Sequence, residues 1–322
     1  MQEKFYKPDA LWEVFNVNNK KEFYKEINLT PKFHEGVPED IVNEFKTVEY
    51  LIVLSYHHVA FLDEAVTKSL VAIEMTIKLK AKQLEIPIEL KNEKNNKSSS
   101  KSLFKLTKEV LNRVGLSSLQ AEFDRTRRMR NNKVHKDMHT FMGVIGNPIN
   151  NIRLIINLIN QIFLEEPVIK NIIEKENKYK NQLLNFQNKP MVLEFERKRI
   201  LIESIPIFKY IEYKNTKLLV LVIDPIINNV YENITKNPSR KLLILTLKDF
   251  IVNNNDIKGL DSQNNQVCVS FTNKEENMNV FNTFIVEKQK VDHTNLFVYN
   301  DAINRDAPWE IEKIVFENCW YK

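Results

Sequence analysis

The spacing of apolar residues changes abruptly near Pro190, and this change constrains the fold more than any other feature of the sequence. Before Pro190, apolar residues recur three and four positions apart, which is the period of an amphipathic helix. After it, short apolar or alternating runs are separated by Asn, Asp, Pro and Gly, a texture typical of strands. The sequence therefore predicts an α+β protein of two domains, with an all-α domain first and an α+β domain with a mixed or antiparallel sheet second.

Four segments are expected along the chain. Residues 1–36 form an N-terminal helical extension, residues 37–165 a bundle of four to five helices, residues 166–189 a charged linker helix, and residues 190–322 the α+β domain. The length of 322 residues agrees with two domains of roughly 150 residues each.

Apolar stripes and capping residues place the individual helices of the bundle. Helices are predicted from Pro38, from about Leu62 to Leu84, from Ser102 to Gly115, from Ser117 or Ser118 into a basic run, and after Pro148. The segment Lys91–Lys101 contains no apolar residue, so we expect it to be an exposed loop.

Short runs rich in β-branched and aromatic residues predict the strands of the second domain. These runs are Met191–Glu196, Arg199–Ile205, Lys217–Ile223, Lys241–Leu247, Gln266–Thr272, Asn295–Tyr299 and Ile311–Phe316. Between two of them, Lys274–Lys288 predicts a helix.

Composition excludes several classes of protein. Cys268 and Cys319 lie far apart, which argues against a disulfide framework and favours a cytoplasmic location. No apolar run approaches the ~20 residues of a membrane span, so we expect no membrane partner. With only five glycines there is no Gly-rich phosphate loop, and we expect no cofactor and no metal. The net charge of +5 permits an anionic partner.

The most basic part of the chain lies at the end of the fourth predicted helix. Six cations fall close together there, with no acid between the first and the last: Arg125, Arg127, Arg128, Arg130, Lys133 and Lys136. Arginine predominates, and its planar fork matches phosphate oxygens. We therefore predict contact with RNA through Arg125, Arg127, Arg128 and Lys136. The alternative is that the run is only the solvated face of a helix.

Within this run, Arg130, Asn131 and His135 combine groups suited to phosphodiester chemistry. The unperturbed pKa of histidine, about 6.5, suits proton transfer near neutral pH, and arginine is a permanent cation. On a straight helix, Arg130 and His135 point about 140° apart. Either the helix is irregular there, or a second copy of the chain completes the site, as a twofold homodimer would.

Arg130-Asn131-x-x-x-His135 resembles the R-x(4–6)-H motif of the HEPN superfamily (higher eukaryotes and prokaryotes nucleotide-binding), and the resemblance covers residues 38–165. It implies a metal-independent endoribonuclease whose paired motifs form the active cleft of a dimer. His135 would be the general acid or base, Arg130 would stabilise charge on the phosphate, and Asn131 would orient His135 or the phosphate. The products would carry a 2′,3′-cyclic phosphate. Many members serve toxin–antitoxin, abortive-infection or anti-phage defence systems, so an antitoxin or another defence protein is a possible partner.

Glu74 and Lys133 are the expected supporting residues. Glu74 interrupts the apolar stripe of the second predicted helix, and a half-buried carboxylate needs a cation. It either holds Arg130 or Arg127, as an acid on the corresponding helix does in some HEPN proteins, or it is an exposed residue at the rim of the bundle.

Other functions stay open at this point. The bundle is alternatively an inactive HEPN-like module that binds RNA or a partner such as a nucleotidyltransferase antitoxin. His135 and His139, four residues apart, are a rival metal pair. The second domain recognises, regulates or binds a partner, or carries chemistry of its own. Its acids are scattered near the ends of the predicted strands: Glu194, Glu196, Asp224 and Asp249.

Overall fold

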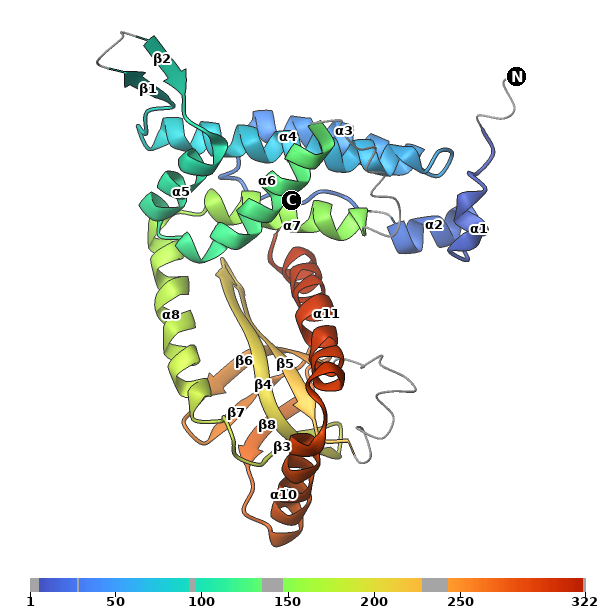
Figure 1. The fold of residues 1–322 in the computed structure, drawn as a ribbon, viewed down its shortest axis with the longest axis vertical. Coiled ribbons are helices and arrows are strands. Elements are labelled where there is room, and N and C mark those ends of the chain that lie inside the picture. The colour runs from blue at the N-terminus through green and yellow to red at the C-terminus, as the bar shows by residue number, and fades with distance from the viewer. Residues whose placement is uncertain (1–5, 28, 93–96, 135–146, 228–242, 321–322) are drawn as a thin grey trace. The chain divides into compact units, whose positions relative to one another are not determined.

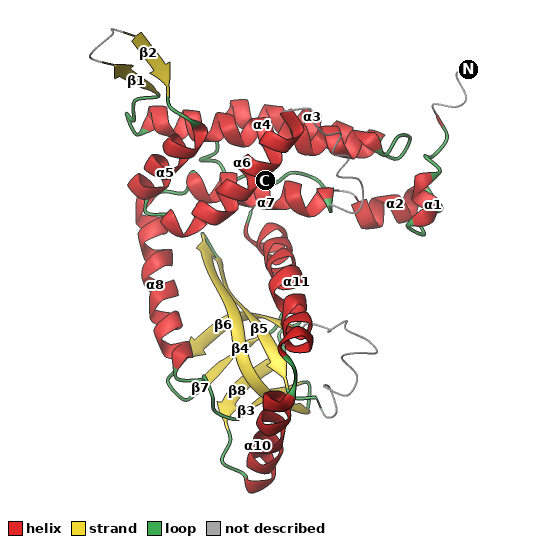
Figure 2. Cartoon of the chain, in the orientation of Figure 1, coloured by secondary structure: helices red, strands yellow, loops and turns green. Residues whose placement is uncertain are grey.

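The computed structural model describes residues 6–27, 29–92, 97–134, 147–227 and 243–320. They form two compact units: the described residues up to Ile169 together with Trp320, and the residues from Lys170 to Cys319. The chain is of mixed α+β class, as predicted (Figure 1). Figure 2 shows helices in both units, whereas all described strands except the β1–β2 hairpin belong to the second unit.

Helices make up most of the first unit. They are α1 (Leu11–Val14), α2 (Lys20–Ile27), α3 (Glu39–Leu54), α4 (Ala60–Gln83), α5 (Leu103–Val114), α6 (Gln120–Val134) and α7 (Pro148–Ile162), with a 3₁₀ turn at Ser117–Leu119. The predicted helices of the bundle are confirmed. Their ends follow local chemistry: Ser102 accepts a hydrogen bond from the amide of Lys105, and Gly115 ends α5 in the left-handed region at φ 84°.

The long helix α4 is the centre of this unit, because α3, α5, α6 and α7 all contact it. Its apolar stripe is buried, including Leu62, Val66, Ile73 and Ile77. Small residues between them, Ala65, Ser69 and Ala72, are buried as well. The α6 helix, which carries the basic run, is therefore packed against α4 and α5.

Residues 89–100 contradict the prediction of an exposed loop over Lys91–Lys101. They contain a two-stranded antiparallel hairpin, β1 (Glu89–Asn92) and β2 (Lys97–Ser100). Main-chain hydrogen bonds pair the two strands, and Ser99 and Ser100 are exposed. Such a hairpin needs no apolar alternation, so the sequence pattern did not indicate it.

The second unit is built on a closed antiparallel barrel. After α8 (Glu166–Leu184), which carries the chain into this unit, the strands are β3 (Met191–Phe195), β4 (Lys198–Tyr213), β5 (Thr216–Pro225), β6 (Leu243–Val252), β7 (Asp256–Leu260) and β8 (Gln266–Phe271). Pairing of β3 with β8 closes the barrel. The prediction left a mixed and an antiparallel sheet open, and the described strands pair antiparallel. Closure of the sheet was not predicted. Strand β7 was missed because Asp256-Ile-Lys-Gly-Leu260 is short and only partly apolar.

Inward side chains of the strands form the barrel core, and residues at the end of α8 complete it. Tyr179, Leu183 and Phe186 belong to the same buried cluster as the strand residues. The Tyr179 ring lies 5.3 Å from that of Tyr210 and 5.6 Å from that of Phe250. The expected linker helix is thus also part of the barrel core.

Two predicted strands, Asn295–Tyr299 and Ile311–Phe316, are wrong. Both lie in the long helix α11 (His293–Cys319), which follows α10 (Glu275–Lys290), the helix predicted over Lys274–Lys288. The two runs are rich in β-branched and aromatic residues, and this propensity misled the prediction. Burial of one side favours a helix here, because the residues spaced four apart are all buried: Tyr299, Ile303, Ala307, Ile311 and Val315.

A polar cluster joins α8 to β4. Oε2 of Glu212 accepts hydrogen bonds from Tyr210 Oη at 2.5 Å, Lys175 Nζ at 2.7 Å and Asn171 Nδ2 at 2.7 Å. Burial alone would raise the pKa of Glu212, but hydrogen bonds from Lys175 and Tyr210 and the charge of Lys175 hold it below the ordinary value of 4.5.

Ionised Glu212 therefore stabilises the second unit above about pH 4.5, and this contribution is lost as the pH falls through the lowered pKa. We expect Glu212→Gln to reduce the free energy of unfolding at pH 7 by about 1–2 kcal/mol and to flatten the acid limb of its pH profile. Urea unfolding between pH 7 and pH 3 measures both effects. Glu287→Gln, at an exposed acid of α10, is the matched control. Parallel pH profiles for Glu212→Gln and the unaltered protein would contradict the assignment.

Candidate functional site

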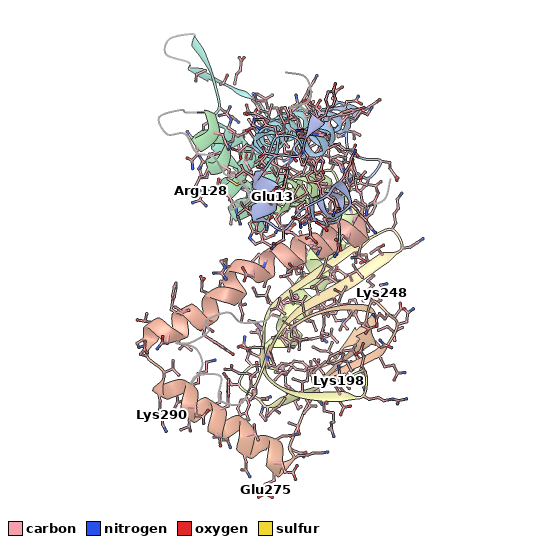
Figure 3. All side chains as sticks on the ribbon, turned by 90° about the vertical axis from the view of Figure 1, so that its right-hand side faces the viewer. Glu13, Arg128, Lys198, Lys248, Glu275 and Lys290 are labelled. Carbon is pink, nitrogen blue, oxygen red and sulfur yellow. The ribbon has the colours of Figure 1, made fainter. Side chains whose placement is uncertain are left out.

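The basic run lies on α6, a continuous α-helix from Gln120 to Val134. On its inner face, Phe123 and Thr126 are buried. Arg125 and Arg128 are exposed, and Arg128 lies at the surface of the first unit (Figure 3). Burial of part of the side chain and the neighbouring charge of Arg128 lower the pKa of Arg125, but a guanidinium stays a cation at neutral pH.

Arg130 faces α4 and forms an ion pair with Glu74. The distance from Nη2 of Arg130 to Oε2 of Glu74 is 2.9 Å, and the two side chains are 31% and 20% exposed. Nη1 of Arg130 also donates to Oδ1 of Asn131 at 3.4 Å. Of the two predictions for Glu74, the structure shows the pairing with Arg130. The guanidinium is thus held in one orientation, while the Arg130 side chain as a whole stays partly exposed.

Lys133 forms a second ion pair between α6 and α4. Its Nζ lies 2.8 Å from Oδ2 of Asp63, and the side chains are 10% and 11% exposed. Asp63 and Glu74 are eleven residues apart on α4, about three helical turns, so they share a face of that helix. Lys133 therefore holds α6 against α4, as expected of a supporting residue. Asp63 was not singled out in the sequence, and an acid on the apolar stripe was the available signal.

Arg127, the next arginine on the inner side of α6, contacts an aromatic ring. Its Cζ lies 5.4 Å from the ring centroid of Phe104 on α5, and its Nε makes a long contact of 3.5 Å with Oδ1 of Asp124. The described cations of the run therefore differ in exposure: Arg127, Arg130 and Lys133 are only partly exposed and contact α4 or α5, whereas Arg125 and Arg128 are exposed.

A small cavity separates α4, α5 and α6 at this point. Its lining includes Glu74, Thr107, Arg127 and Arg130, and its volume of about 10 Å³ is that of one water. A phosphate does not fit between these helices. An anionic substrate would instead reach the exposed part of the Arg130 side chain from outside the helices.

Two of the predicted site residues, His135 and Lys136, lie outside the described residues, as does His139 of the rival metal pair. The structure therefore brings together Arg130, Asn131 and Glu74, and holds Lys133 nearby on the same helix.

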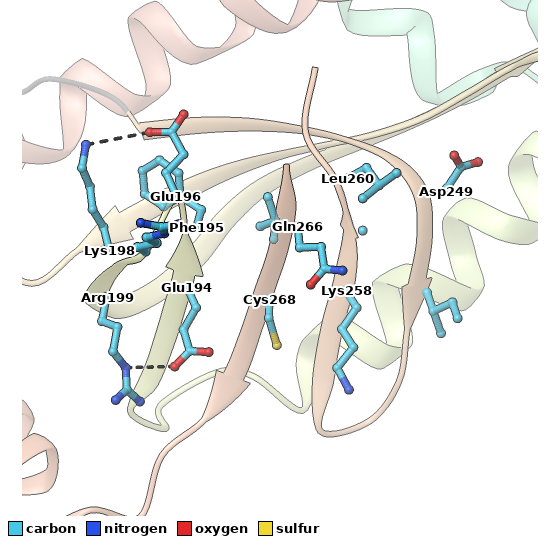
Figure 4. Close-up of a pocket in the computed structure, with 14 residues that line it drawn as sticks. Glu194, Phe195, Glu196, Lys198, Arg199, Asp249, Lys258, Leu260, Gln266 and Cys268 are labelled. Carbon is cyan, nitrogen blue, oxygen red and sulfur yellow. Dashed lines mark ion pairs between the residues drawn. The ribbon is translucent and has the colours of Figure 1, made fainter. Parts of the chain in front are cut away.

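The barrel of the second unit has a larger groove that the sequence did not indicate (Figure 4). It encloses about 700 Å³ and is lined by the turn of the β3–β4 hairpin, residues 194–199, and by β6, β7 and β8. The sequence did not indicate this groove because the residues that line it come from segments far apart in the chain. Gly259 is required beside it, since a Cβ there would lie 2.9 Å from Cβ of Phe250.

The charged side chains of this groove are largely paired with one another. Nε of Arg199 lies 2.9 Å from Oε1 of Glu194, and Nζ of Lys198 lies 3.9 Å from Oε2 of Glu196. Burial raises the pKa of Cys268, which keeps the thiol protonated and a poor nucleophile.

Of the scattered acids, Glu194, Glu196 and Asp249 line this groove, whereas Asp224 does not. In the part of the chain that the structure describes, no three His, Cys, Asp or Glu side chains gather as a metal site would need. Among the same residues, no helix has the length and apolar character to cross a membrane.

Comparison with known proteins adds no family to this description. No protein-family model, no curated protein and no solved structure matches the chain. The functional conclusion therefore depends on the residues of the site.

Proposed function

We propose that the chain is a metal-independent endoribonuclease of HEPN type that acts as a homodimer in prokaryotic toxin or anti-phage defence. The observation that carries the proposal is the Arg130–Glu74 ion pair near the end of α6, five residues before His135. An arginine that is oriented by a carboxylate and whose side chain is still partly exposed is preorganised to meet a phosphate.

In the proposed reaction, the neutral imidazole of His135 takes the proton of the ribose 2′-hydroxyl. The 2′-oxygen attacks phosphorus and the bond to the 5′-oxygen breaks, while the protonated His135 of a second copy donates a proton to that leaving oxygen. Arg130 stabilises the additional negative charge on the phosphate, and Asn131, which accepts from Arg130, helps to orient it. The products are a 2′,3′-cyclic phosphate and a 5′-hydroxyl.

The orientation of Arg130 supports the dimeric form of the proposal. α6 is regular up to Val134, and its Arg130 points toward α4. Continuing that helical period would turn position 135 about 140° away from Arg130. A second copy of the chain, related by a twofold axis, supplies the His135 that acts with Arg130 of the first copy, and the reverse.

A second candidate is a module of the same kind that binds RNA, or an antitoxin-like partner, without cleaving it. The exposed Arg125 and Arg128 favour it, because an outward pair of arginines serves binding whether or not the site is active. In either case, the barrel unit is proposed to recognise a target or to regulate the helical unit.

Incubation of the purified full chain with RNA in excess EDTA tests the proposal. We expect cleavage to persist, since no step uses a metal, and to yield 2′,3′-cyclic phosphate ends detectable by mass spectrometry. Cleavage lost in EDTA and restored by Mg²⁺ would contradict the mechanism. Tight RNA binding without any cleavage would favour the second candidate.

A further inference from the structure

We propose that Phe104 and Arg127 form a subsite that stacks an unpaired base of single-stranded RNA beside Arg130. The inference rests on the proposed function and adds to it the class of substrate. It starts from an exposed aromatic ring, since Phe104, in the first turn of α5, is 40% exposed.

The ring is joined to the candidate active site through Arg127. The guanidinium of Arg127 lies over the Phe104 ring, with Cζ 5.4 Å from its centroid. Arg127 is three residues from Arg130, and both line the same small cavity. Residues three apart on a helix are neighbours, with Cβ atoms about 5–6 Å apart. Phe104, Arg127 and Arg130 therefore form one continuous surface.

Arg127 has donors left for a ligand. Within the described residues its hydrogen bonding is limited to the long contact from Nε to Asp124, so both Nη groups remain free to bind an anion. The side chain is 30% exposed. A guanidinium against an aromatic ring offers a flat apolar face and phosphate donors together.

The aromatic ring and the free donors of Arg127 favour single-stranded RNA over a duplex. The faces of bases in a duplex are covered by their neighbours, whereas an unpaired base can stack on a protein ring. Stacking is tolerant of sequence because every base has a π-face. The subsite therefore favours RNA loops or single strands and leaves the identity of the base open.

The experiment measures binding apart from cleavage. The full chain is titrated into a single-stranded RNA that carries 2-aminopurine and is 2′-O-methylated throughout, so that no 2′-hydroxyl can attack. We expect stacking to quench 2-aminopurine fluorescence. Phe104→Ala should weaken affinity by about 5- to 150-fold and abolish the quenching, whereas Phe104→Trp should retain both.

Two controls test whether the loss of binding is specific to the Phe104 ring and to single strands. Tyr50→Ala removes a more exposed aromatic residue of α3 in the same unit and should bind like the unaltered protein. Affinity for a duplex of the same sequence should be equal in the Phe104→Ala and unaltered proteins. Thermal unfolding checks that Phe104→Ala stays folded.

The outcomes separate this inference from the proposed function. If Phe104→Ala binds single strands normally while the unaltered chain still cleaves RNA, the subsite is wrong and the ribonuclease stands; a protein partner would then be the occupant of this surface. An equal loss for single strands and duplex would also overturn the subsite. If the unaltered chain neither binds nor cleaves RNA, both proposals fall.

Discussion

Replacing Arg130 by alanine is expected to lower the rate of RNA cleavage by about 10²- to 10³-fold, the usual effect of removing one preorganised donor to a developing negative charge. The change also leaves Glu74, only 20% exposed, without its guanidinium partner. Arg130→Lys is therefore the second variant, since it keeps the charge near Glu74 but loses the planar fork. We expect it to stay folded and to remain strongly impaired.

His135→Ala is expected to reduce cleavage by about 10²- to 10⁴-fold, because it removes the proposed proton-transfer group. The measured quantities are kcat and KM on a fluorogenic RNA, together with the thermal midpoint and the oligomeric state. Arg128→Ala is the matched control on the same helix, and its exposed position should affect KM more than kcat. Full activity of either the Arg130 or the His135 variant would remove the mechanism.

Glu74 is expected to act on the reaction through Arg130. Glu74→Gln keeps a hydrogen-bond acceptor near Nη2 of Arg130 but removes the charge, so kcat should fall less than in Arg130→Ala. Lys78 is the control, since its Nζ lies 2.7 Å from Oε1 of Glu74 and its side chain is 51% exposed. Lys78→Ala should leave kcat unchanged. Combining Glu74→Gln with Arg130→Ala should cost no more than Arg130→Ala alone, because the two changes remove one interaction.

Trp320→Ala is expected to destabilise the first unit by about 3–5 kcal/mol, the range for deleting a buried tryptophan. Trp320 is 2% exposed, and its Nε1 donates to Oδ1 of Asn157 at 2.6 Å. Its ring centroid lies 6.1 Å from that of His34, whose ring bridges the amide of Gly36 and the carbonyl of Asn160. A residue from the far end of the chain is thus part of the core of the first unit.

Chemical denaturation of the full chain, followed by separate probes for helix and for strand, measures this loss. Trp320→Phe should retain most of the packing and lose about 1 kcal/mol through the missing hydrogen bond. Phe297→Ala, at a ring that is 70% exposed, should change stability by less than about 0.5 kcal/mol. If Trp320→Ala shifted only the transition of the barrel, the assignment of Trp320 to the first unit would be wrong.

Helices with complete local signals were predictable from the sequence. The ends of α5 at Ser102 and Gly115 could be predicted, because capping and left-handed backbone are properties of individual residues and their near neighbours. The strands β3 and β8 were predictable for the same reason, since the short apolar run of β3 and the alternation of β8 are local features. In α11, local propensity pointed the other way, and burial of one side of the helix against the barrel strands decided its structure.

The candidate site likewise has one part that the sequence predicts and one part that depends on tertiary packing. The sequence by itself determined that Arg130 and Asn131 lie side by side in a basic helical segment, because residues near in sequence on a helix stay near in space. Only the tertiary structure decided that Arg130 is held by Glu74, that Lys133 is held by Asp63, and that Arg127 lies over Phe104. Each of these contacts depends on the rotation of α6 about its own axis relative to α4 and α5. That rotation is set by how whole apolar faces pack, which no short motif specifies.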